Sequence, residues 1–338
     1  MALRRKFTPT RGEEGTTEAQ IQQRILVALE CSAQSVDTVR YIGGLFKGGL
    51  AKITLFHMLD LHPESFLDLK SGQNDPRYDS TGVREWEFEQ RRMARAFMDK
   101  AVRILVGAGY SAAEVAVVVK DRVFDLSRDL AQEGRRGYDA LVLGRSAINL
   151  MGGMILENVA TRLIGQLNRL PVWVVGGKPN TSKIVIAMDC SRGARNALDY
   201  VGKMFLKVFP SVLLLHIGRK GGMIDPELRP FFAVHESRDW MERSKADHEV
   251  GNRGMESFLD RCLEELGELG ADRSRIRIKV VHEAKSVPEA ILQASLDGDY
   301  GTMVLGRRDL SKIEEMIRGR TGNRILQLAR EKAVWVVH

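Results

Sequence analysis

Apolar residues are grouped along the chain in a pattern typical of buried strands joined by helices. Ala140–Leu143 is an unbroken apolar run that stops at Gly144, and Pro171–Val175 closes the same segment. A polar loop with further glycines and a helical run from about Asn158 lie between the two. A strand that is apolar on both faces is typical of a parallel sheet covered by helices. The pattern therefore predicts a strand, a loop, a helix and a second strand.

The same pattern occurs a second time at a fixed spacing. Tyr300–Arg308 repeats Tyr138–Ser146, and Ala333–Val337 repeats Pro171–Val175, in each case 162 residues further along the chain. Two apolar strands and the loop between them are not expected to recur at one spacing by chance. The sequence thus predicts an internal duplication.

Earlier in each half, three more apolar runs predict strands. As pairs of first and second copy, they are 25–29 and 184–188, 53–58 and 212–217, and 115–119 and 276–281. Ser32, Ser191 and Ser286 are expected to cap the helices that follow them. A helix is also expected directly after Asp121, and Gly109 is expected to end the helix before it, as Gly270 does in the second copy.

Amphipathic helices are predicted before the third strand of each half. Their apolar residues recur at three and four residues, which predicts a stripe that packs into the core. The stripe in the first half is Met93, Phe97, Ala101, Ile104 and Leu105, and that in the second half is Met255, Phe258, Leu259, Cys262, Leu263 and Leu266.

These elements predict an α/β protein with two tandem doubly wound domains, each with a five-stranded parallel sheet flanked by helices. We expect a flexible amino-terminal tail over 1–20 and domains over 21–177 and 183–338. Gly176–Ser182 is the expected linker, because it is rich in Gly, Pro, Asn and Ser.

Composition narrows the class of protein. The 338 residues are 44% hydrophobic and 28% charged, which is typical of a globular protein with a sizeable core. No apolar run is long enough to cross a bilayer, and Met1–Gln20 has no apolar segment typical of a secretory signal. Cys31, Cys190 and Cys262 have neither metal-ligand nor redox spacing, which favours reduced thiols and a cytoplasmic location.

The net charge of +7 is expected to reflect a solvated surface, with attraction to phosphate groups as the second interpretation, and nucleic-acid binding is not favoured. The arginines are scattered, without a long basic run or interleaved aromatic residues. His57 and His216 occupy equivalent places, 159 residues apart, at the ends of the second strands. A lone histidine at such a place is more often packed and hydrogen bonded than catalytic.

Enzyme motifs are incomplete. Gly144–Ile148 begins like the turn that carries a nucleophilic serine, but it lacks the closing glycine. Gly176–Pro179 has a Gly-Lys pair without the other residues of a phosphate-binding P-loop. No group of residues supplies a nucleophile, a base and an orienting partner, so we do not expect an enzyme, or at most a weak ATPase.

With its acidic residue after the first strand, its glycine loop and its Val-Trp-Val-Val ending, the chain resembles a tandem universal stress protein. The resemblance covers about 21–338. It implies a five-stranded sheet of the adenine nucleotide alpha hydrolase-like fold in each half. Many members of that family bind ATP through an Asp that ends the first strand and a loop with three glycines followed by Ser or Thr. Other members lack the glycines and bind no nucleotide.

The first half departs from that motif at several positions. Gly144 matches the first glycine, but Ala147 and Glu157 replace the second and third, and Asn158 takes the hydroxyl position. Glu30 replaces the Asp on the adenine side. A carboxylate such as that of Glu157 repels a triphosphate unless Mg²⁺ intervenes. Gly144, Ser146 and Asn158 are left as hydrogen-bond donors.

The second half matches the motif better. Asp189 matches the Asp, and Gly306 and Gly319 match the first and third glycines, whereas Asp309 and Arg320 replace the second glycine and the hydroxyl residue. Glycine lets the backbone approach phosphate oxygens closely. Arg307, Arg308 and Arg320 are near in sequence and can form charge-assisted bonds with phosphate.

Two interpretations therefore stay open. In one, the second half binds ATP or a related adenine nucleotide, with Mg²⁺, and the nucleotide alters contacts with an unidentified partner protein. In the other, both halves are free of nucleotide and the chain is an interaction scaffold. Its halves then pair through their terminal Val-Trp-Val-Val strands, or copies of the chain associate as a homodimer, because an apolar edge strand needs a partner.

Overall fold

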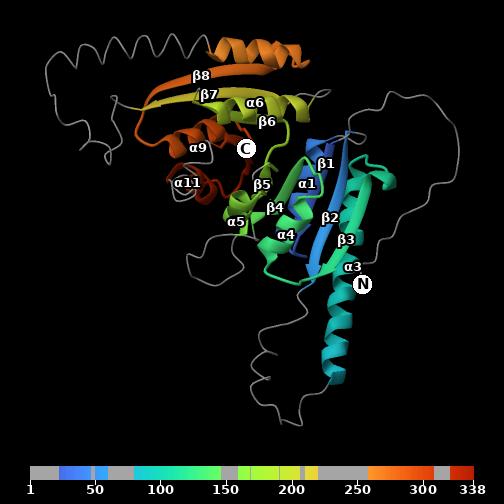
Figure 1. The fold of residues 1–338 in the computed structure, drawn as a ribbon. Coiled ribbons are helices and arrows are strands. Elements are labelled where there is room, and N and C mark those ends of the chain that lie inside the picture. Colours follow the sequence, from blue (N-terminus) through green and yellow to red (C-terminus); the bar gives the residue numbers. More distant parts are fainter. Residues whose placement is uncertain are drawn as a thin grey trace, which may run out of the picture. The chain divides into compact units, whose positions relative to one another are not determined.

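The computed structural model (Figure 1) describes residues 23–46, 50–59, 80–145, 159–167, 169–189, 191–205, 210–219, 258–307 and 320–338. The chain divides into two compact units, Met1–Lys178 and Pro179–His338. Both units have α/β architecture with a parallel sheet, so the predicted fold class is confirmed. The tail predicted over 1–20 lies outside the described residues.

The elements of the first unit alternate as the sequence predicts. In chain order they are β1 (Gln23–Leu29), α1 (Ala33–Leu45), β2 (Ala51–Leu59), α3 (Ser80–Gly107), η2 (Ala112–Glu114), β3 (Val115–Asp121), α4 (Leu126–Gly134), β4 (Ala140–Gly144), α5 (Val159–Gln166) and β5 (Val172–Val175). The predicted strands lie within one to three residues of these bounds.

The five strands of the first unit run in the order β3-β2-β1-β4-β5, and all neighbours are parallel. Ile25 of β1 lies opposite Ile53 of β2 on one side and Ala140 of β4 on the other. Helix α1 packs against α3, and α4 packs against α5. Strand β4 is buried throughout and β1 is buried at Ile25, Leu26, Val27 and Leu29, which explains the apolar sequence of β4 and of residues 25–29.

The second unit repeats this order. Its elements are β6 (Lys183–Met188), α6 (Arg192–Met204), β7 (Ser211–Arg219), a helix over 258–268, η4 (Arg273–Arg275), β8 (Ile276–Ala284), α9 (Val287–Asp297), β9 (Thr302–Gly306), α11 (Arg320–Leu328) and β10 (Ala333–Val337). Its strands run β10-β9-β6-β7-β8, and these neighbours are also parallel.

Most predicted helix ends are confirmed. Ser32, Ser191 and Ser286 each accept a hydrogen bond from the backbone N–H three residues later, as N-cap residues do. Gly109 and Gly270 follow the ends of their helices with φ of +97° and +90°, a conformation that glycine adopts without strain. In the helix over 258–268, the predicted stripe is buried apart from Met255, which lies outside the described residues.

Two predictions about the first unit are wrong in detail. Met93 is 47% exposed, and α3 instead buries Ala94, Met98, Ala101 and Leu105, so the core-facing stripe is shifted by one residue at its start. Helix α4 does not begin directly after Asp121. It begins at Leu126, capped by Asp125, because Asp129 accepts hydrogen bonds from the N–H groups of Val123 and Phe124 and holds the preceding segment as a turn.

One polar contact is repeated in both units. His57 Nδ1 donates to the carbonyl of Leu29 at 2.7 Å, and His216 Nδ1 donates to the carbonyl of Met188 at 2.8 Å. Each histidine thereby joins the second strand to the end of the first, which supports the expectation of packed, hydrogen-bonded residues. Among the helices that the structure describes, none combines the length and the apolar character required to cross a membrane.

Candidate functional site

In each unit the candidate site lies where the strand order reverses. Strands β1 and β4 are neighbours, but the chain leaves them toward opposite edges of the sheet, and β6 and β9 are arranged in the same way. In open α/β sheets, ligands bind beyond the carboxyl ends of the strands at such a point. Glu30 follows β1 next to Gly144 on β4, and Asp189 follows β6 next to Gly306 on β9. The structure therefore brings together the first acidic residue and the first glycine predicted for each half.

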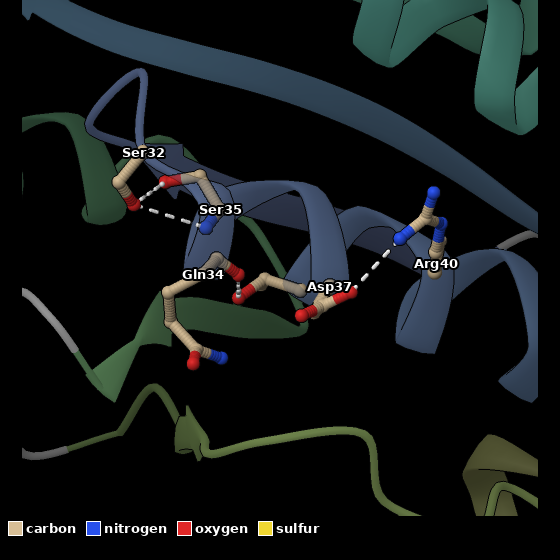
Figure 2. A network of polar contacts seen from close by, with 6 residues as sticks. Ser32, Gln34, Ser35, Asp37 and Arg40 are labelled. Carbon is tan, nitrogen blue, oxygen red and sulfur yellow. Dashed lines mark hydrogen bonds and ion pairs between the residues drawn. The ribbon is translucent and has the colours of Figure 1, made fainter.

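In the first unit, serine side chains occupy the start of α1 (Figure 2). The N–H of Ser35 donates to Ser32 Oγ at 3.1 Å, and the two hydroxyls lie 3.2 Å apart. The N–H of Glu30 donates to Ser35 Oγ at 3.0 Å. These contacts satisfy backbone donors that would otherwise face an anion at the helix N-terminus. The cap by Ser32 has a counterpart in Ser191 of the second unit, whereas the Ser35 hydroxyl has none, because Ala194 stands at that position.

Asp189 occupies the equivalent place in the second unit. Its Oδ1 accepts a hydrogen bond from the N–H of Ser191 at 3.1 Å, and Ser191 Oγ accepts one from the N–H of Ala194 at 3.1 Å. The carboxylate lies at the positive end of the α6 dipole, which stabilises its charge. Asp189 is exposed, whereas Glu30 is half-buried, so the second unit presents its acidic group more openly.

Gly306 has a packing role in the second unit. A Cβ at Gly306 would lie 1.9 Å from the carbonyl oxygen of Gly193, and a Cβ at Gly193 would lie 2.2 Å from the carbonyl oxygen of Arg307. The first turn of α6 therefore rests directly on the backbone at the end of β9. The sequence motif predicts that Gly306 lets phosphate approach the backbone, and it gives Gly193 no role. A glycine in the first turn of a helix was the signal that could have found it.

A buried cation follows Gly306. Arg307 is 8% exposed, and its Nη1 donates to Nδ1 of His338 at 3.0 Å. Its backbone N–H donates to the carbonyl of Val337, and Asn196 on α6 donates to the carbonyl of His338 at 3.1 Å. Burial lowers the pKa of Arg307, and burial together with the nearby guanidinium lowers that of His338 to about 4. At neutral pH, His338 is therefore an uncharged acceptor for Arg307. His338 and Asn196 were missed by the sequence analysis.

Cys31 and His57 lie close together in the first unit without forming a nucleophile and base. Cys31 Sγ is 3.8 Å from both ring nitrogens of His57, so the sulfur lies in line with neither nitrogen lone pair. Nδ1 already donates to the carbonyl of Leu29. Burial raises the pKa of the thiol to about 11, which disfavours the reactive thiolate.

Several predicted site residues lie outside the described part of the chain: Ser146, Asn158, Arg308 and Gly319. Arg320 is the first residue of α11, but its side chain is not among those described. Within the described residues, no three His, Cys, Asp or Glu side chains are grouped as metal ligands would be. The described part of the site thus consists of Glu30 and Gly144 in the first unit, and Asp189, Gly306 and Arg307 in the second.

The chain is similar to known proteins both in sequence and in structure. The model of the Universal stress protein family matches residues 180–338. A universal stress protein from Archaeoglobus fulgidus DSM 4304 is 16% identical with a TM-score of 0.54, and the match covers 93% of this chain and 95% of that one. A search of curated proteins found no match.

Two further solved structures match over most of the chain. A protein from Pseudomonas aeruginosa PAO1, described as functionally unknown, is 14% identical over 94% of this chain and 93% of its own, with a TM-score of 0.45. A putative universal stress protein from Pseudomonas aeruginosa UCBPP-PA14 is 16% identical over 94% of each chain, with a TM-score of 0.44. The Archaeoglobus match shows that the chain has the adenine nucleotide alpha hydrolase-like fold of universal stress proteins, and the sequence of residues 180–338 matches the model of that family.

Proposed function

We propose that this chain is a tandem universal stress protein-like binding protein of the stress response. In this proposal the first unit is a diverged second domain of the same family, and the second unit binds ATP or a related adenine nucleotide. The observation that carries the proposal is that Asp189 and Arg307 directly follow the neighbouring strands β6 and β9, where the strand order of the second unit reverses.

The two groups suit opposite ends of a nucleotide. An exposed carboxylate can accept hydrogen bonds from the neutral donors of an adenine nucleoside. A guanidinium that is largely withdrawn from water attracts phosphate more strongly than an exposed one does. The first unit has Glu30 in place of Asp189 and lacks two of the three motif glycines, so binding is assigned to the second unit. Mg²⁺ would accompany a triphosphate.

The test is calorimetric titration of the full chain with ATP and Mg²⁺, together with chromatography of any nucleotide released when the purified protein is denatured. Asp189→Asn should weaken binding at least tenfold, while the matched variant Glu30→Gln should leave it unchanged. If the wild-type chain releases no nucleotide and gives no heat, the nucleotide proposal is wrong. If Glu30→Gln has the larger effect, binding belongs to the first unit.

The second candidate is a nucleotide-free interaction scaffold, in which the two units pair through their terminal strands. Within its own unit's sheet each of these strands lies at one end of the strand order, and the sequences Val-Trp-Val-Val and Ala-Val-Trp-Val-Val carry no charge. Such an edge favours pairing with another strand.

The tryptophans themselves do not test that pairing. Trp173 stacks on Phe46 with ring centroids 6.1 Å apart, and Trp335 stacks on Phe205 at 6.0 Å, each within its own unit. Replacing Trp335 by Lys would therefore report on folding. Hydrogen exchange in the full chain is the better measurement: if the terminal strands pair, the N–H groups of β5 and β10 that face away from β4 and β9 should be protected. Rapid exchange of these groups would reject the pairing.

A further inference from the structure

Strand β3 is the other edge of the first unit's sheet, and its only charged residues, Lys120 and Asp121, lie at its carboxyl end. It begins the strand order, so no described strand pairs with its outer side (Figure 1). Residues 115–119 are Val-Ala-Val-Val-Val, a run without charge, glycine or proline. Exposed edges of this composition are available for pairing with another strand.

The equivalent edge of the second unit is protected. Strand β8 carries the charged, exposed residues Arg277 and Lys279 within its sequence, and its pairing with β7 is irregular between Ile217 and Arg219. Charges and irregular pairing are the usual means by which an edge strand avoids association. The two copies of the duplicated unit thus differ at this edge, and only β3 is open to pairing.

The hydrogen bonds of β3 show which backbone groups face outward. The N–H of Arg122 donates to the carbonyl of Leu59 on β2 at 2.9 Å. Backbone groups alternate between the two sides of a strand, so even-numbered residues of β3 face β2. The N–H and C=O groups of Val115, Val117, Val119 and Asp121 therefore face away from the sheet. These groups can form hydrogen bonds with a further strand that pairs antiparallel with β3.

We propose that β3 pairs antiparallel with β3 of a second copy of this chain. A second copy is favoured because the strand is complementary to itself. When Val118 faces its own symmetry mate, Val117 lies opposite Val119 within the strand, and Glu114, directly before the strand, lies toward the exposed Arg122, directly after it. Opposite charges and β-branched pairs directly across an antiparallel ladder stabilise it. The pairing is isologous, so the two ends of the interface are the same.

The residues next to the strand also suit this arrangement. Val123 and Phe124, directly after β3, are 74% and 47% exposed. They lie just beyond the end of the strand, beside the edge that a second copy would occupy. Pairing would thus cover two exposed apolar side chains in each copy in addition to the strand edges.

The proposal is tested with the full chain by sedimentation over a range of concentrations. The wild-type protein should change from monomer to dimer as its concentration rises. Val117→Pro removes an outward N–H without affecting the ladder with β2. It should weaken dimerisation at least about tenfold, because the dimer loses two symmetry-related hydrogen bonds, one donated by each copy. The matched control is Ile278→Pro at the equivalent place in β8, which should leave dimerisation unchanged.

A second variant distinguishes loss of the interface from misfolding of the chain. If Val117→Pro lowers the unfolding midpoint, Val117→Lys, which introduces like charges across the two-fold axis, should separate the dimer while retaining the wild-type unfolding midpoint. A chain that remains monomeric at every concentration would overturn the proposal. So would a dimer that resists both Val117 substitutions, because its interface would then lie elsewhere, for example at the terminal strands. These outcomes do not depend on nucleotide binding.

Discussion

Gly193 and Gly306 meet backbone to backbone, although they are 113 residues apart in the sequence. A Cβ at Gly306 would lie 1.9 Å from the oxygen and 2.1 Å from the carbon of the Gly193 carbonyl group. The first turn of α6 and the end of β9 can approach so closely only because both residues lack side chains. The contact fixes the distance between the α6 N-terminus and Arg307, and with it the geometry of the candidate site.

The first prediction concerns this contact. Gly306→Ala should lower the free energy of unfolding by about 3 kcal/mol, because the new methyl group meets backbone atoms that cannot move aside. The control is Gly267→Ala, where a Cβ would have no atom within 4 Å, and this substitution within a helix should be neutral or stabilise by about 0.5 kcal/mol. Chemical denaturation measures both. Equal stability of the two variants would show that the close approach does not exist.

The second prediction concerns pH. The pKa of His338 is lowered from 6.5 to about 4 in the folded chain, so the unfolded chain binds the proton more readily. Its contribution to stability is therefore complete above pH 6.5 and is lost progressively as the pH falls toward 4. The loss reaches at most about 3 kcal/mol, since each unit of pKa is worth about 1.4 kcal/mol.

The matched variant for this titration is His338→Asn. Its side-chain oxygen can accept the hydrogen bond from Arg307 without titrating, so the variant should be less sensitive to acid than the wild type. Urea denaturation at a series of pH values gives the comparison. The same pH dependence in both proteins would contradict the assigned role of His338.

The third prediction concerns Cys31. Although the residue is exposed, its thiol pKa of about 11 leaves little thiolate at neutral pH, roughly a hundredfold less than an ordinary cysteine has. Alkylation of Cys31 by iodoacetamide, followed by peptide mass spectrometry, should be slow at pH 7 and should accelerate steadily up to about pH 11. The denatured chain is the control. Fast alkylation of the native chain at pH 7 would show that the thiol is activated.

The fourth prediction compares a buried with an exposed ion pair in the first unit. Glu133 is 3% exposed and contacts Lys120 Nζ at 2.5 Å. Lys120→Met should cost about 2 kcal/mol, which is less than the usual cost of breaking a buried pair, because Arg136 and Tyr138 still contact Glu133. Arg92→Met, which breaks the exposed pair with Glu89, should leave stability unchanged, because solvent screens that pair. Similar costs for both would show that Glu133 does not depend on Lys120.

The order of the elements could be predicted because a strand that is buried on both faces has a continuous apolar sequence, such as Ala140–Leu143. Few other structural elements have such a sequence. Helix starts were predictable where a serine caps the helix. The start of α4 was not, since it depends on the carboxylate of Asp129, which binds the N–H groups of Val123 and Phe124 from within the helix. A pattern of apolar residues does not contain that information.

The core-facing side of α3 was missed for a related reason. Alanine gives a weak apolar signal, yet Ala94 and Ala101 are buried while Met93 is exposed. Small residues suit a face where helices approach closely, and α1 and α3 do so: a Cβ at Gly43 would lie 3.0 Å from the Cβ of Ala108. At the site, the sequence motif assigned Asp189 and Gly306 to one place, and in the structure they lie at the ends of the neighbouring strands β6 and β9. It could not reveal the partner of Gly306, because only the folded sheet brings Gly193 to it.

The alternating charges of β8 limit how far copies of this chain can assemble. If both copies of the duplicated unit had kept a bare outer strand, each molecule would offer two such strands, and association could continue without end into a fibre. With Arg277 and Lys279 on β8, β3 is the one of these two outer strands that is open, and one symmetric partner covers it in the proposed dimer. The difference between the two outer strands thus limits association through them to a dimer, whereas two identical open strands would permit a polymer.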